Sequence, residues 1–140
     1  MKILCTTILS AALALFACNN KLKIDTSSFT LNEPFQLKML ETAKMTDGTL
    51  QVTFTGLPED SRCPEDVNCI WEGQVRLFID AAVPEKKENI EFKIEKSKMG
   101  KVSRKFDNYT ILVEDVRPIP KSGVQIAKEN YVVTLRIMNQ

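Results

Sequence analysis

Histidine is absent from the 140-residue chain, and the chain has only four cysteines and one tryptophan. The lack of histidine excludes the Ser-His-Asp and Cys-His catalytic arrangements and the common zinc sites. Nineteen basic residues face eighteen acidic ones, so the excess positive charge of a nucleic-acid-binding protein is also missing. The length suits a single domain. We therefore expect no nucleic-acid partner, no cofactor and no second domain.

The one long apolar run lies at the N-terminus, where Lys2 precedes residues 3–17. A basic start, a short apolar core and small residues before a cleavage point are typical of a secretory signal. About fifteen residues are too few to span a membrane comfortably, which takes about twenty. The end of the run, Leu15-Phe16-Ala17-Cys18, resembles the bacterial lipoprotein box, in which lipid is attached to the cysteine. The alternative is an ordinary secretory signal with a chance cysteine.

Lipidation at Cys18 predicts a protein anchored in the cell envelope by acyl chains such as palmitate, with residues 1–17 removed as the signal peptide. Two or more acyl chains hold a protein durably at a bilayer. Asn19 follows where inner-membrane lipoproteins carry aspartate, so the resemblance favours the outer membrane in a cell with two membranes. Residues 18–28 are mostly polar and are predicted to form a flexible membrane tether. Loss of Lys2 would leave equal numbers of basic and acidic residues.

Apolar and polar residues alternate from Phe29 onwards, which is typical of strands with one buried face. The clearest runs cover residues 35–39, 50–54, 75–79, 90–94, 109–113 and 131–137. No stretch has an apolar stripe at helical spacing. Pro118 and Pro120 end the strand expected over 109–116, because proline cannot donate to a ladder. A short helical turn is expected at 125–128. The pattern predicts an all-β domain over 29–140, an antiparallel β-sandwich or small barrel of about seven strands.

Cys63 and Cys69 are the cysteines that remain after processing, and in an exported chain they predict a disulfide. Closing a loop of about seven residues contributes about 2.4 kcal/mol, so its larger role is to fix the shape of the loop. The spacing is not that of thiol oxidoreductases, and no further ligands exist to complete a zinc site. Trp71 either packs on the disulfide and caps the core, or stands exposed on a rigid loop for binding.

The residues around these cysteines, Asp60-Ser61-Arg62-Cys63-Pro64 and then Val67-x-Cys69-x-Trp71-x-Gly73, resemble the signature of a group of small bacterial lipoproteins of unknown function. The resemblance extends loosely to residues 109–120, a strand that ends in Pro-x-Pro. Glu72 departs from the pattern, which has a small residue there. The resemblance implies a β-rich envelope lipoprotein and supplies no activity.

Two clusters of charged residues, one acidic and one basic, can each be interpreted as functional or as purely structural. Acidic residues flank the cysteine loop and supply the oxygen ligands that Ca²⁺ prefers, yet they do not follow the EF-hand spacing: Glu59, Asp60, Glu65, Asp66 and Glu72. Asp60 and Arg62 are also placed for a local ion pair, which contributes little to stability if it is exposed.

Basic residues are concentrated near Gly100. They either bind anionic lipid or polysaccharide or protect strand edges from pairing: Lys96, Lys98, Lys101, Arg104 and Lys105.

The chain carries no catalytic signature, so we expect a non-enzymatic binding or structural domain. The candidate binding loop comprises Asp60, Arg62, Glu65, Asp66 and Trp71. Its expected partner is an envelope protein or a polysaccharide. The alternatives are a secreted-type enzyme inhibitor, which would also use a stiffened loop, and a small metal-binding protein or hydrolase that acts through carboxylates.

Overall fold

The computed structural model describes residues 26–140. The expected signal peptide, the lipidation site at Cys18 and most of the expected tether lie outside these residues. The first sheet has the order β1-β3-β4-β5-β6. Its strands are β1 (Thr26–Phe29), β3 (Thr42–Met45), β4 (Gln51–Asp60), β5 (Gln74–Val83) and β6 (Lys86–Glu95).

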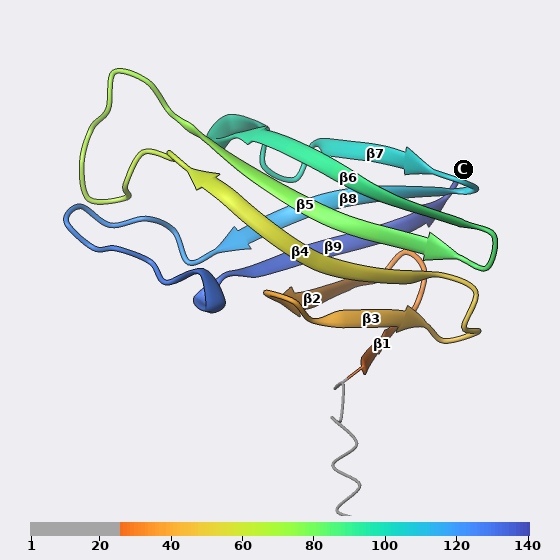
Figure 1. The fold of residues 1–140 in the computed structure, drawn as a ribbon. Coiled ribbons are helices and arrows are strands. Elements are labelled where there is room, and N and C mark those ends of the chain that lie inside the picture. The colour runs from red at the N-terminus through yellow and green to blue at the C-terminus, as the bar shows by residue number, and fades with distance from the viewer. Residues whose placement is uncertain (1–25) are drawn as a thin grey trace, which may run out of the picture.

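The second sheet has the order β2-β9-β8-β7 and lies against the first (Figure 1). It contains β2 (Pro34–Lys38), β7 (Val102–Phe106), β8 (Tyr109–Arg117) and β9 (Val132–Asn139), and the 3-10 turns are η1 (Lys96–Lys98) and η2 (Lys128–Asn130). All neighbouring strands are antiparallel except β1 and β3, which are parallel. The expected all-β sandwich is confirmed, and residues 26–140 form nine strands where about seven were expected.

The core lies between the sheets and is built from the inward positions of the alternating runs. Successive side chains of a strand point to opposite faces, so every second residue enters the core. The buried residues of the longer strands include Val52, Phe54, Val75, Leu77, Ile79, Phe92, Ile94, Ile111, Val113, Val133, Leu135 and Ile137. Burial of this many large apolar side chains is the main favourable term in folding.

Two strands break the period-two rule. In β4 the pairing with β5 shifts between Phe54 and Gly56 and again before Glu59, and in β8 it shifts between Val113 and Asp115. A bulge adds a residue to one strand and reverses which positions face inward. Leu57 and Val116 are therefore buried, three residues beyond Phe54 and Val113.

The six alternating runs correspond to β2, β4, β5, β6, β8 and β9. The strands that the sequence pattern did not identify, β1, β3 and β7, have only four or five residues each. The sheet begins at Thr26 rather than at residue 29, because the last three residues of the expected tether pair with β3. The expected helical turn lies at η2, slightly later than 125–128.

Three connections meet at one end of the sandwich, on the left in Figure 1: the β4–β5 loop, the β8–β9 loop and the β6–β7 connection. Hydrogen bonds join them, from the Glu65 amide to the Pro120 carbonyl (3.0 Å) and from the Ser97 amide to the Glu72 carboxylate (2.7 Å). The β5–β6 and β7–β8 hairpins lie at the other end. Among residues 26–140, no helix is long and apolar enough to cross a membrane.

Candidate functional site

The base of the β4–β5 loop contains a buried ion pair. The Arg62 guanidinium donates to both carboxylate oxygens of Asp60, from Nε to Oδ1 at 2.7 Å and from Nη2 to Oδ2 at 2.6 Å. The two side chains are only 4% and 5% exposed. The sequence indicated the pair but not whether it is exposed, and the structure places it in the interior. The reason is that the β8–β9 region of the second sheet covers it.

Arg62 also fastens the two sheets together. Its Nη1 donates to the carbonyl of Val116 at 2.7 Å, and its Nη2 donates to the carbonyl of Pro118 at 2.9 Å. Both acceptors lie where β8 ends. A buried charge is tolerated when its hydrogen-bonding groups find partners. Arg62 is therefore a structural clamp rather than an exposed binding group.

Tyr131, immediately before β9, completes this network. Its hydroxyl donates to Asp60 Oδ2 at 2.9 Å. Burial of the phenol, together with the neighbouring Asp60 carboxylate, raises the pKa of Tyr131 to about 12. Tyr131 lies far from Asp60 in the sequence, and no local pattern predicted their contact. Asp60 thus links residues from β4, the loop and the start of β9.

The disulfide between Cys63 and Cys69 is confirmed, with the two Cα atoms 5.9 Å apart. The Cys63 amide donates to the Glu72 carbonyl (2.9 Å) and the Ser61 amide to the Gln74 carbonyl (2.8 Å), so both sides of the loop are tied together. Gly73 has a φ of +70°, and a Cβ there would lie 1.8 Å from the Ser61 carbonyl oxygen. Only glycine fits this close approach of two backbones.

The acidic residues of the loop do not converge. Glu65 forms an ion pair with Lys121 (3.2 Å), and Asp66 accepts a hydrogen bond from the Ser122 amide (2.8 Å). Glu72 accepts from Ser97. Each carboxylate is directed to a different neighbour, and residues 26–140 contain no group of three acidic or cysteine ligands arranged for a metal. The calcium site considered from the sequence therefore has no geometric support in the described part of the chain.

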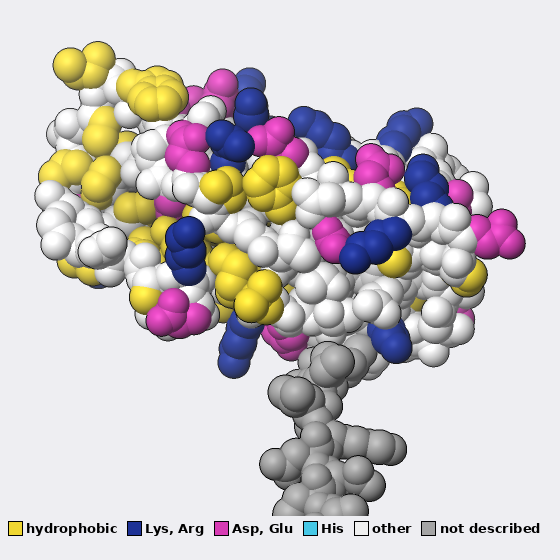
Figure 2. Space-filling model, viewed as in Figure 1, with side chains coloured by type: hydrophobic (Ala, Val, Ile, Leu, Met, Phe, Trp, Pro, Cys, Tyr) yellow, Lys and Arg dark blue, Asp and Glu magenta, His cyan; other side chains and the backbone are white. Residues whose placement is uncertain are grey.

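The tip of the loop, residues 64–72, carries three exposed hydrophobic side chains, which we call the apolar apex: Val67, Ile70 and Trp71. Ile70 is fully exposed, Trp71 is 61% exposed and Val67 is 43% exposed. Figure 2 shows hydrophobic side chains gathered at this end of the molecule, at the upper left. Of the two interpretations of Trp71, the structure supports the exposed one. Sequence analysis did not identify Val67 and Ile70, because apolar residues in a loop do not reveal which way they face.

Of the basic residues near Gly100, Lys96 lies beside this loop. Lys96 donates to the carbonyl of Cys63 at 3.2 Å and so supports the loop. Arg104 lies over the ring of Phe92. These two residues, together with Lys98, Lys101 and Lys105, are exposed and form no ion pair with a carboxylate among residues 26–140.

The residues of the candidate binding loop therefore fall into three structural groups. Asp60 and Arg62 are buried at its base, Glu65 and Asp66 are bonded to the β8–β9 loop, and Trp71 faces solvent. What the arrangement offers chemically is a stiff apolar surface whose neighbouring carboxylates, those of Glu65, Asp66 and Glu72, are already bonded. No protein-family model, no curated protein and no solved structure matches this chain.

Proposed function

We propose that the protein is a non-enzymatic lipoprotein of the cell envelope that binds another envelope protein through the apolar apex. The observation that carries the proposal is the exposure of Val67, Ile70 and Trp71 on a loop held by a disulfide and a buried ion pair. Large apolar side chains release free energy when a partner covers them, and Trp is enriched among the residues that dominate binding energy at interfaces. A loop that is already rigid loses little conformational entropy on binding.

A protein partner fits the apex better than a polysaccharide does. Sugar hydroxyls need hydrogen-bonding side chains, whereas the three carboxylates nearest the apex are already bonded within the protein: Glu65, Asp66 and Glu72. Trp71 provides one ring on which a sugar could stack, but Val67 and Ile70 beside it are aliphatic and provide none. Such side chains are buried well by the apolar centre of a protein interface.

Crosslinking in intact cells tests the proposal. The full lipoprotein is recovered from crosslinked membranes as the wild type, as an Ile70→Ala/Trp71→Ala variant and as a Leu112→Ala control. Leu112 is a half-buried apolar residue that lies between the inward-facing Ile111 and Val113 and so faces away from the core. We expect one reproducible protein partner, reduced at least about tenfold in the apex variant because interface hot spots contribute 2 kcal/mol or more, and retained in the control.

Equal recovery of the partner from all three proteins would contradict the role of the apex. Retention of the wild type on purified envelope polysaccharide, lost in the apex variant, would assign the same surface to a carbohydrate instead. The lipid anchor is tested separately by palmitate labelling. The wild type is expected to take up label and a Cys18→Ser variant to take up none.

Inhibition of an envelope or secreted enzyme is a second candidate, favoured by the complete exposure of Ile70 between two fixed halves of the loop. Enzyme inhibitors present such side chains on stiff loops and thereby avoid ordering costs. Assays against a panel of proteases and lysozymes distinguish this function. Loss of enzyme activity with the wild type, and not with Ile70→Ala, supports inhibition.

A further inference from the structure

The turn η1 is bonded to the loop that carries the apolar apex. The Ser97 amide and hydroxyl both donate to the Glu72 carboxylate, at 2.7 and 2.9 Å, and the Lys96 amide donates to the Gly73 carbonyl at 3.3 Å. Glu72 directly follows Trp71 in the chain. The turn is therefore a fixed neighbour of the apex rather than a separate surface.

Lys98, the last residue of η1, lies within reach of a partner that covers Trp71. The path from Trp71 through Glu72 and Ser97 limits the distance between the Cα atoms of Trp71 and Lys98 to about 17 Å. A protein interface of ordinary size buries about 800 Å² on each side, which corresponds to a disc with a radius of about 16 Å. Because the Lys98 side chain is itself long, such a partner would meet it at the polar rim of the interface.

The two flanks of the apex differ in charge. On the side of the β8–β9 loop, Lys121 already pairs with Glu65 at 3.2 Å. On the side of η1, residues 96–101 contain three lysines and no acidic residue, and all three lysines are exposed. None of the three forms an ion pair with a carboxylate among residues 26–140. The η1 flank therefore has an excess of positive charge even when Glu72 is counted.

Protection of a strand edge does not explain these lysines. β7 begins at Val102, so Lys98 and Lys101 precede it, and only Arg104 and Lys105 lie on that edge strand. Lysines that are neither paired within the described chain nor placed on an edge strand are available to an oppositely charged surface.

We propose that the partner of the apolar apex is an acidic protein surface, in which aspartate and glutamate residues lie beside an apolar site and face Lys98 and Lys101. The inference rests on the proposed function and specifies the chemistry of its partner. Buried apolar contacts supply most of the affinity of an interface, whereas complementary charge at the rim speeds association and excludes wrong partners. Because the unpaired lysines lie on one flank only, they would also fix the orientation of the partner.

A zero-length carbodiimide crosslinker joins lysine amines directly to carboxylates, and it tests the proposal on isolated membranes that hold the full lipoprotein. We expect mass spectrometry to find Lys98 or Lys101 linked to aspartate or glutamate of the protein that is recovered through the apex. The Lys98→Arg/Lys101→Arg variant keeps the charge but lacks the amines. It should still recover the partner with a general crosslinker, and it should lose the carbodiimide links.

Charge reversal measures how much the η1 flank contributes. Lys98→Glu is expected to lower partner recovery at least about threefold, because attraction at the rim becomes repulsion. Recovery by the wild type should also fall when crosslinking is carried out at about 1 M rather than about 0.1 M salt, since the Debye length shortens from about 10 Å to about 3 Å.

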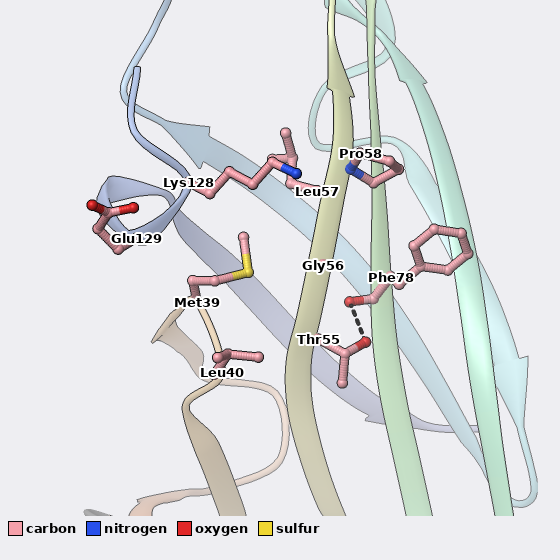
Figure 3. Close-up of a pocket in the computed structure, with 9 residues that line it drawn as sticks. All are labelled: Met39, Leu40, Thr55, Gly56, Leu57, Pro58, Phe78, Lys128 and Glu129. Carbon is pink, nitrogen blue, oxygen red and sulfur yellow. Dashed lines mark hydrogen bonds between the residues drawn. The ribbon is translucent and has the colours of Figure 1, made fainter. Parts of the chain in front are cut away.

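Lys128 provides a matched control. It is an exposed lysine in the other 3-10 turn, η2, which Figure 1 shows on the opposite side of this end of the sandwich from η1. Figure 3 shows Lys128 and Glu129 at a mainly apolar cleft of about 500 Å³ between the β2–β3 turn and β4. Lys128→Glu makes the same change of charge away from η1 and is expected to leave partner recovery unchanged.

The outcomes separate this inference from the proposed function. Full recovery by Lys98→Glu, together with loss in Ile70→Ala/Trp71→Ala, would overturn the acidic partner and leave binding through the apex in place. Full recovery by both variants, or no partner for the wild type, would overturn the proposed function and this inference with it. Carbodiimide links from Lys98 to acidic sugars alone would overturn the inference and assign the lysines to a polysaccharide.

Discussion

The base and the tip of the β4–β5 loop are only a few residues apart, yet their side chains serve opposite purposes. At the base, Asp60 and Arg62 are charged and buried, and they are bonded to each other and to the second sheet. At the tip, Ile70 and Trp71 are apolar and exposed. The usual preference of charges for water and of apolar groups for the interior is reversed in both places.

This contrast separates the residues that build the loop from those that it presents. A buried charged network is expensive unless every member is satisfied, and here it holds the loop in one shape. The exposed apolar group contributes nothing to folding and is useful only if a partner covers it. Within the loop and its base, Asp60, Arg62 and Gly73 therefore support the surface that Trp71 displays.

The largest loss of stability should follow from removal of the Arg62 side chain, which joins the two sheets. We expect Arg62→Ala to lower the free energy of unfolding by about 3 to 5 kcal/mol, because Asp60 is left buried without its counter-ion. Urea unfolding measures the change. The control is Arg117→Ala, which breaks the exposed pair with Asp115 and should cost less than about 1 kcal/mol. Similar losses in the two variants would mean that burial of the first pair is unimportant.

Gly73→Ala is expected to lower the free energy of unfolding by a smaller amount, about 2 to 4 kcal/mol. The backbone must move away from Ser61, and alanine must adopt a strained φ. Gly123 is a matched control, since its φ is +71° and nothing lies within 4 Å of its Cβ position. Gly123→Ala should cost only about 1 to 2 kcal/mol. Equal melting temperatures of the two variants would show that the loop tolerates the contact.

Tyr131 makes the stability contributed by the base of the β4–β5 loop dependent on pH. Its pKa is raised from 10.0 to about 12, so the folded protein keeps a proton that the unfolded chain loses. The resulting stability is complete below pH 10 and is lost as the pH rises towards 12, by about 2 to 3 kcal/mol. Unfolding experiments over this range should show a steeper decline for wild type than for Tyr131→Phe. Parallel curves would exclude Tyr131 as the source.

The smallest effect on stability is expected at the tip. Ile70→Ser and Trp71→Ser should each change the free energy of unfolding by less than about 0.5 kcal/mol, because neither side chain is buried. Thermal melts measure this directly. A loss of 2 kcal/mol or more in either variant would show that the tip contributes to folding and would remove the contrast with the base.

Much of the fold was predictable because it depends on local alternation. Six strands and the disulfide followed from the sequence. By contrast, β1 and β3 have only four residues each, and β7 has three exposed residues in a row and therefore no alternation. The bulges were not predictable either, because Leu57 and Val116 are inward-facing only after the pairing shifts. In the site, Asp60, Arg62 and Trp71 were identified as a group, but their division into buried and exposed residues was not.

The absence of histidine, the alternating strands and the pair Cys63–Cys69 were determined by the sequence alone, because composition, period and oxidation chemistry are local properties. Tertiary structure decided the rest. The carbonyls of Val116 and Pro118 come from the end of β8, and the hydroxyl of Tyr131 comes from the residue before β9. Together they enclose Asp60 and Arg62. No segment of the described chain crosses the loop to cover Trp71 in the same way. Burial depends on which surfaces meet in space, and that is settled only when the two sheets pack.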